Sequence, residues 1–214
     1  VFKAADQKTN ASNVSQGTTG VVTGSSANAV SAEQIGTLMQ ATIAGNPQAA
    51  NVASAAAVVG GGENLAVTSI TDIANAVANG AISGAVNGGF DVSAVTQAMS
   101  AGAISGASTS GQNIAIVSGA ATQGAVSSAI KAGADSSAVT QAATQGAIFG
   151  AANFGADVAA ISSAATQGAV VGAFGSGANI GDITQAATQG IVVGASGSGV
   201  DIAAVSQAAT QGAV

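Results

Sequence analysis

A repeat of 22 residues constrains this chain more than any other feature of its sequence. Counted from Ile70, seven repeats follow one another without an insertion, and the seventh ends at Val214. Position 7 of the repeat is always Ala, position 11 is always Gly, and the last position of each full repeat is Asp or Asn. Proteins with periods of this length stack one structural unit per repeat against the next. The repeats begin at Ile70, Val92, Ile114, Ser136, Val158, Ile180 and Ile202.

The apolar positions of the repeat follow the period of a helix. Positions 1, 4, 7, 8, 11, 12 and 15 fall on one side of a helical wheel and carry mainly Ile, Val, Ala or Gly, and the polar or variable positions fall opposite. A strand fits less well, because the near-constant positions include both odd and even numbers. Position 13, always Val or Ile, is the exception. It falls on the polar side, so residues such as Val170 and Val192 are expected to face outward and to pack between chains.

The ends of the repeats predict where each helix begins and ends. The Asp or Asn before the first apolar residue is a good N-cap, because its side chain accepts free N–H groups of the first turn. Ser69 occupies this place before the first repeat, with Asp72 as an acidic partner three residues later. A Gly-rich segment, such as Ser-Gly-Ser-Gly at 196–199, is then expected to end the helix. Each repeat therefore predicts a helix of about 14–16 residues and a loop of about six.

Glycine on the apolar side predicts close packing between helices. Gly inside a helix costs roughly 1 kcal/mol relative to Ala, yet every repeat has Gly at position 11 and most also have it at position 15. Contact between backbones offsets this cost, as in helix pairs that carry small residues four positions apart. We therefore expect an all-α fold of tandem 22-residue single-helix repeats, packed through Ala and Gly as a helical solenoid or a layered bundle.

A β-solenoid or curli-like amyloid is the alternative fold. The segments Asn-Val-Ser-Gln-Gly at 13–17 and Ile-Thr-Gln-Ala-Ala-Thr-Gln-Gly at 183–190 faintly resemble curli repeats, which have a similar length and also use Gln, Asn and Gly. The alternating apolar residues and the Gly-x-Gly-Asn turn of that family are missing from this chain. Its glutamines recur four residues apart, and Ala is a poor strand former. The helix is favoured, and the β alternative stays open at this point.

The sequence before the repeats divides into two segments. Residues 1–29 form a polar arm rich in Gly, Ser and Thr, which either orders against a neighbour or stays a loose tail. Residues 30–69 are expected to form an N-terminal helical cap on the repeat domain of residues 70–214. In the cap, Ser31 and Gln34 predict a capping box at the start of one helix. A second helix is expected from about residue 48 to 59, where three glycines stop it.

The composition excludes most catalytic chemistry. The chain has no His, Cys or Arg, so it has no Ser–His or Cys–His pair, no thiolate metal site and no disulfide. Its net charge of −6, with three Lys, lacks the basic surface of a nucleic-acid binder. No window is apolar enough for a membrane span, which argues against membrane association. We expect no enzyme, no catalytic, cofactor-binding or metal site, no cofactor, and no nucleic-acid or small-molecule partner.

Two groups of polar residues remain as candidates for a site. Each group repeats at a fixed spacing. Two pairs of carboxylates stand at caps and first turns, which favours capping over a weak Ca²⁺ site. Rows of Thr and Gln are interpreted in three ways: a solvated face, a hydrogen-bonding contact between subunits, or an ice-binding array. The carboxylate pairs are Asp72 with Asp91 and Asp182 with Asp201, and the rows are Thr140–Gln141 with Thr144–Gln145 and Thr184–Gln185 with Thr188–Gln189.

Together these features predict a non-enzymatic structural protein that assembles with itself into an extracellular filament, sheath or surface layer. Charged residues make up only 6%, too few to keep subunits apart, and the seventh repeat stops midway, which leaves an apolar face for another subunit. The chain starts at Val1 rather than Met, which predicts removal of a signal peptide and a secreted protein on the cell surface. The alternatives are a monomeric binding module (an adhesin or ice-binding solenoid), a curli-like functional amyloid, and a membrane-associated assembly using Gly-x-x-x-Gly faces.

Overall fold

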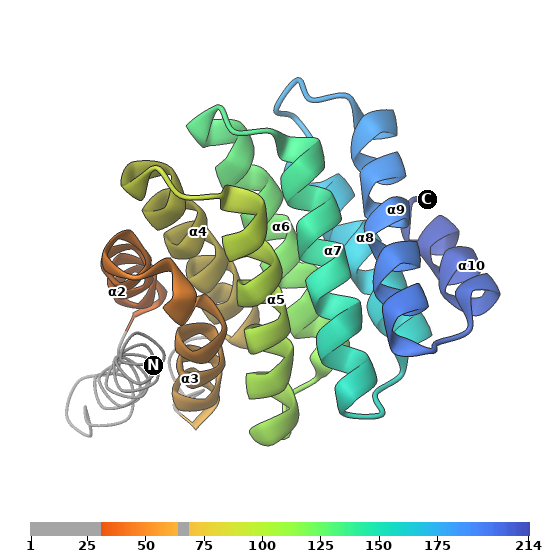
Figure 1. Cartoon of the computed structure of the whole chain (residues 1–214), viewed down its shortest axis with the longest axis horizontal. Helices are drawn as coiled ribbons and strands as arrows, with labels where there is room; N and C mark the ends of the chain where they lie inside the picture. Colours follow the sequence, from red (N-terminus) through yellow and green to blue (C-terminus); the bar gives the residue numbers. More distant parts are fainter. Residues whose placement is uncertain (1–30, 64–68) are drawn as a thin grey trace, which may run out of the picture.

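The computed structural model describes residues 31–63 and 69–214, and these residues fold into nine α-helices and one short 3₁₀ helix, with no strand (Figure 1). The expected all-α fold is confirmed, and the β alternative is disfavoured. The expected polar arm of residues 1–29 lies outside the described residues. The helices are α2 (Ala32–Gly45), η1 (Pro47–Ala49), α3 (Ala50–Glu63), α4 (Ile70–Gly88), α5 (Val92–Thr109), α6 (Ile114–Ala132), α7 (Ser136–Asn153), α8 (Val158–Ala173), α9 (Ile180–Ser198) and α10 (Ile202–Gly212).

Helices α4 to α10 begin at the seven residues that the 22-residue spacing predicts. The Asp or Asn before each of the later six helices is its N-cap; Asp135, for example, accepts a hydrogen bond from the Ala138 N–H at 3.0 Å. Helix α8, with 16 residues, has the expected length, whereas the other complete repeat helices end later, as α9 does with 19 residues. In these longer helices the glycine at position 20, rather than the first Gly of a Gly-rich stretch, follows the end closely. In α9 it is Gly199, whose left-handed φ of 69° only Gly adopts readily.

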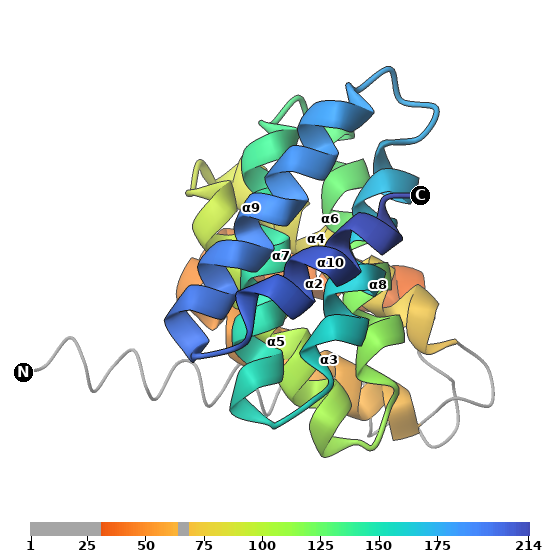
Figure 2. The ribbon, with the colours of Figure 1, turned by 90° about the vertical axis from the view of Figure 1, so that its right-hand side faces the viewer.

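The helices lie in two layers. One layer consists of α2, α4, α6, α8 and α10, and the other consists of α3, α5, α7 and α9 (Figure 1). Helices that follow each other in sequence are antiparallel and belong to opposite layers. The closest packing is between alternate helices, which lie side by side within a layer. We call the two layers together the stack, and Figure 2 shows its α9–α10 end facing the viewer.

Glycines at positions 11 and 15 bring alternate helices into backbone contact, as α5 and α7 illustrate. A methyl group on Gly146 of α7 would collide with the Gln97 carbonyl group of α5. One on Gly150 would lie 3.1 Å from the Ala101 carbonyl oxygen and 2.9 Å from the Ile104 Cβ. Positions 11 and 15 of α7 thus lie against positions 6 and 10 of α5. Helices within a layer are therefore parallel, and each is staggered by five residues relative to the previous one.

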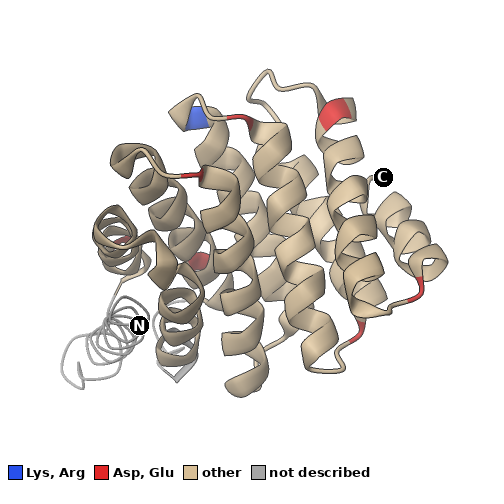
Figure 3. Ribbon diagram, in the orientation of Figure 1, with Lys and Arg blue, Asp and Glu red and all other residues tan. Residues whose placement is uncertain are grey.

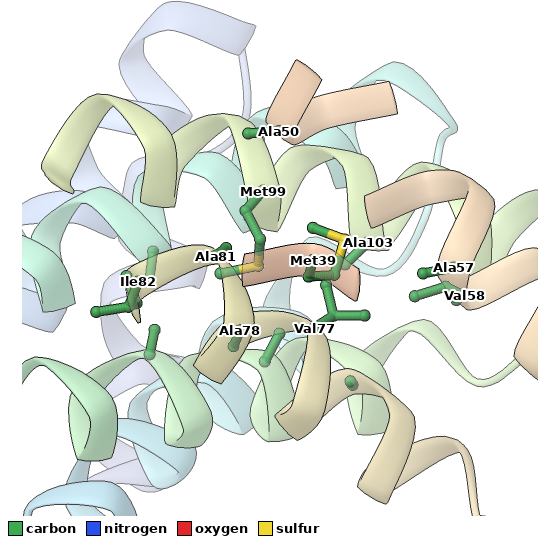
Figure 4. Close-up of a cluster of buried hydrophobic side chains, with 14 of the residues drawn as sticks. Met39, Ala50, Ala57, Val58, Val77, Ala78, Ala81, Ile82, Met99 and Ala103 are labelled. Carbon is green, nitrogen blue, oxygen red and sulfur yellow. The ribbon is translucent and has the colours of Figure 1, made fainter. Parts of the chain in front are cut away.

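Small side chains fill the space between the layers. The Ile or Val at position 4 is at most 3% exposed in all seven repeats, and the Ala at position 16 is at most 1% exposed in all six that have it. Larger side chains gather near the first helices, where Met39, Val77 and Met99 lie together (Figure 4). Ile and Val are buried along the whole stack, for example Ile148 and Ile183, while Ala and Gly fill most of the remaining interior and let helices of the same layer approach each other closely.

Position 13 departs from the sequence expectation. It is at most 1% exposed in the first four repeats, so the prediction that it faces outward is wrong there. The reason is that each inner helix contacts neighbours in both layers, so its buried arc is wider than a single apolar stripe. Val170 and Val192 are half-buried. Helix α10 packs on α8 but ends at Gly212, before the position 15 that covers position 13 in the other pairs, and no described helix packs on α9 within its layer. The four buried residues are Ile82, Ile104, Val126 and Ile148.

Helices α2 and α3 pack like the repeats although they lack the repeat sequence. A methyl group on Gly80 of α4 would collide with the Gly36 carbonyl of α2, the same type of contact that the repeats make with each other. The predicted capping box is confirmed, with the Ser31 N–H donating to Gln34 Oε1 at 2.8 Å. The second helix does not stop near residue 59. It continues to Glu63 because its packing on α5 outweighs the low helix propensity of three glycines.

Candidate interaction surface

The candidate carboxylates serve the helix starts and do not meet in pairs. Asp91 caps α5 by accepting from the Ser93 N–H at 3.0 Å, and Asp201 caps α10 in the same way. Asp72 lies in the first turn of α4 and accepts from the Ser69 hydroxyl at 2.7 Å. Asp72 and Asp91 thus stand at opposite ends of α4, whose 19 residues span roughly 28 Å at 1.5 Å per residue. Asp182 and Asp201 flank α9 likewise, so the capping interpretation fits both pairs.

No arrangement of the described residues suggests a metal centre. Nowhere in the described part of the chain do three His, Cys, Asp or Glu residues gather closely enough to hold an ion. A groove of about 470 Å³ between α2 and α4 does contain two carboxylates, those of Glu33 and Asp72, among amides and hydroxyls. The Asp72 carboxylate is already engaged by Ser69, and the groove is wide open on the surface. The arrangement of side chains in this groove therefore does not indicate a particular ligand or reaction.

The Thr row of α7 is not a surface. Thr140 and Thr144 are fully buried beneath α9. The Thr144 hydroxyl donates to the Thr140 carbonyl of its own helix at 3.0 Å and lies 3.2 Å from the Ala187 carbonyl of α9. Such back-bonding satisfies a hydroxyl without a polar partner from another side chain. For these two residues, the three surface interpretations of the row are wrong, because the row forms a contact between two helices of one chain.

The same row in α9 lies at the surface. Thr184 and Thr188 are half-buried, while Gln185 and Gln189 are exposed. The sequence from Thr184 to Gly190 is identical to that from Thr140 to Gly146. The difference in exposure arises because α9 covers α7, whereas no described helix covers α9. We call this uncovered surface the α9 face, and it consists of Thr184, Gln185, Thr188, Gln189, Val192 and Val193.

The α9 face combines amides with apolar side chains. A shallow groove of about 510 Å³ runs along it, lined by Gln185, Thr188, Gln189, Val192 and Val193 together with Gln141 of α7. Val193 is 45% exposed. Exposed apolar side chains also occur elsewhere on the stack, among them Ile116, Phe154 and Val171, so what distinguishes the α9 face is its sequence rather than its apolar exposure. No charged residue lines the groove among the described residues.

Within residues 31–63 and 69–214, the charged residues lie near the ends of helices rather than on the flanks of the stack (Figure 3). The described helices do not include one with the length and apolarity needed to cross a membrane.

Comparison with protein-family models, with curated protein sequences and with solved structures gives no match.

Proposed function

We propose that this chain is a non-enzymatic structural protein whose tandem 22-residue helices form a repeat solenoid, and whose copies assemble into an extracellular filament, sheath or surface layer. The observation that carries the proposal is the α9 face. It has the sequence of an internal face of the stack, yet it stands open to solvent. We propose that a second copy of the chain covers this face.

The low charge of the chain supports the same function. Only 6% of the residues are charged, so repulsion between like-charged copies is weak. Repeat solenoids that stay monomeric carry a polar face at each end. The α2 end has such a face, with Glu33, Gln34 and Thr37 exposed. The α9 face exposes Val193 instead, which favours assembly over a monomeric binding module.

The absence of reactive side chains supports a structural role rather than a catalytic one. The whole chain has no His and no Cys, and its carboxylates at the repeat boundaries cap helices. Secretion to the cell surface agrees with a chain that has three Lys and no Arg or Cys. The partner that this proposal requires is another copy of the chain.

Sedimentation velocity over a hundredfold range of protein concentration, followed by negative-stain electron microscopy, tests the proposal. We expect open-ended particles that lengthen as the concentration rises. Val193→Lys places a charge on the α9 face and is expected to reduce assembly while the helical circular dichroism stays unchanged. Val86→Lys is the matched control, because Val86 is similarly exposed, at 36%, on α4. A protein that stays monomeric at every concentration contradicts the proposal.

A further inference from the structure

We infer that residues 18–24 of a second copy of this chain occupy the α9 face. The inference rests on the proposed self-assembly and specifies its joint. The segment reads Thr-Thr-Gly-Val-Val-Thr-Gly, and it lies outside the described residues, so the argument uses only its sequence.

The contact between α7 and α9 defines what a helix needs in order to cover this type of face. A methyl group on Gly190 of α9 would collide with the Gln141 carbonyl and with the Thr144 hydroxyl. One on Gly194 would lie 2.9 Å from the Ile148 Cβ. The covering helix therefore needs Gly at position 11, where a larger residue meets backbone. Gly is also usual at position 15, although α6 carries Ser128 there and hydrogen-bonds it to Asn79 of α4.

The α9 face makes the same demand on its occupant. It repeats the seven residues from Thr140 to Gly146 without a change, and Val192 replaces Ile148 at position 13 with another β-branched side chain. An occupant with glycines over Gln185 and Gln189 would thus fit α9 as α9 itself fits α7.

Most glycine pairs of the chain are already engaged. The described pairs at positions 11 and 15 each lie against the preceding helix of their own layer. Gly20 and Gly24 form a further pair, and their surroundings match those of Gly190 and Gly194. Thr-Thr-Gly-Val-Val-Thr-Gly and Thr-Gln-Gly-Ile-Val-Val-Gly share Thr at position 9, Gly at 11, Val at 13 and Gly at 15. The engaged pairs are Gly80/Gly84, Gly102/Gly106, Gly146/Gly150, Gly168/Gly172 and Gly190/Gly194.

The order of the helices agrees with this joint. The segment precedes α2, and α2 belongs to the layer of α10. If residues 18–24 of the second copy cover α9, its α2 is the next element available to cover α10, and the alternation of the two layers continues across the joint. The contact of Gly80 with the Gly36 carbonyl places Gly45 of α2 at a position equivalent to 15. It places Ala41 at a position equivalent to 11, where every repeat has Gly. A contact of α2 with α10 would therefore be less close at Ala41 than the contacts between repeats. Ala41 and Gly45 are both exposed, and no atom would meet a methyl group on Gly45.

Disulfide trapping tests the joint, because the chain has no Cys of its own. The 3.2 Å contact between Thr144 at position 9 and Ala187 at position 8 has its equivalent in Thr188 and Gly17. We would mix the single variants Thr188→Cys and Gly17→Cys under mild oxidation. About tenfold more cross-linked dimer is expected than with Thr109→Cys and Gly17→Cys, because docking raises the effective concentration of the two thiols. Thr109 is an exposed control residue at the end of α5.

The outcomes separate this inference from the proposed function. Assembly together with the Thr188–Gly17 cross-link supports both. If the protein assembles but Thr188→Cys with Gly17→Cys gives no more cross-linked dimer than the control pair, the joint is overturned and self-assembly still stands. If two Thr188→Cys molecules cross-link with each other, the contact is symmetric, between two α9 faces, and the proposed joint is overturned. A protein that does not assemble at all overturns the proposed function and the joint with it. As a second variant, Gly20→Val is expected to shorten the particles by the same steric clash without changing helix content.

Discussion

The face of α7 that lies under α9 and the face of α9 that points to solvent share one sequence in two environments. In α7 the Thr side chains at positions 5 and 9 are fully buried, and in α9 the equivalent Thr184 and Thr188 are half-buried. Ile148 is 0% exposed, whereas Val192 at the same position is only partly covered. Burial in this fold is therefore decided by a helix 44 residues further along the chain, and not by the residue types of the face itself.

The largest expected effect concerns the glycines that make the internal contact. Gly190→Ala would place a methyl group against the α7 backbone, which cannot move aside, and should lower the free energy of unfolding by about 2–3 kcal/mol. The same change at Gly45, where the space is open, should raise it by about 0.5 kcal/mol through helix propensity. Urea denaturation of dilute protein measures both. Equal effects of the two substitutions would show that close backbone contact does not stabilise the stack.

The next effect compares one residue type on the two kinds of face. Val126→Ala removes two methyl groups from a fully buried position 13 and should cost about 2 kcal/mol, including the cavity left behind. Val192→Ala, at the same position on the α9 face, should cost less than about 1 kcal/mol in dilute solution. Thermal and urea unfolding of the two variants provide the measurement. If Val192→Ala costs as much as Val126→Ala even when the protein is dilute, α9 is already covered in the isolated chain.

The smallest effect concerns the caps. Asp157→Ala and Asp201→Ala each remove an N-cap whose carboxylate accepts a hydrogen bond from the first turn, and each should cost about 1 kcal/mol. α8 lies between α6 and α10, so its cap should affect unfolding of the whole stack. α10 has no further helix of its layer upon it among the described residues, so its cap should affect only α10. Amide hydrogen exchange distinguishes the two, and equal loss of protection throughout the stack in both variants would contradict the distinction.

Local signals in the sequence predicted the helix class and the helix starts. The Asp or Asn before each repeat is the N-cap in the structure, and the capping box of Ser31 and Gln34 is present. These features depend on residues within one turn of each other, so a single sequence contains them. The extension of α3 through three glycines was not predicted, because packing on a distant helix outweighs local propensity there.

The candidate surface was predicted only in part. The sequence singled out the Thr and Gln rows but treated α7 and α9 alike, because the two rows are identical. A helical wheel drawn for one helix assumes a single buried side, so it placed position 13 on the outside. In the structure, neighbours from both layers bury the residues at this position in the first four repeats, which are Ile82, Ile104, Val126 and Ile148. Which rows are internal depends on how many helices follow in the same layer, and that is a property of the stack rather than of any repeat.

The five-residue stagger between parallel neighbours has a geometric consequence. Each helix is displaced by about 7.5 Å along its own axis relative to the previous one in its layer, at 1.5 Å per residue. Because the helices of the two layers run in opposite directions, one layer climbs while the other descends. The line joining the layers must therefore rotate at every step, which winds the molecule about its long axis. Any polymer that continued this geometry would be a coiled ribbon, able to stretch by unwinding, and not a straight rod.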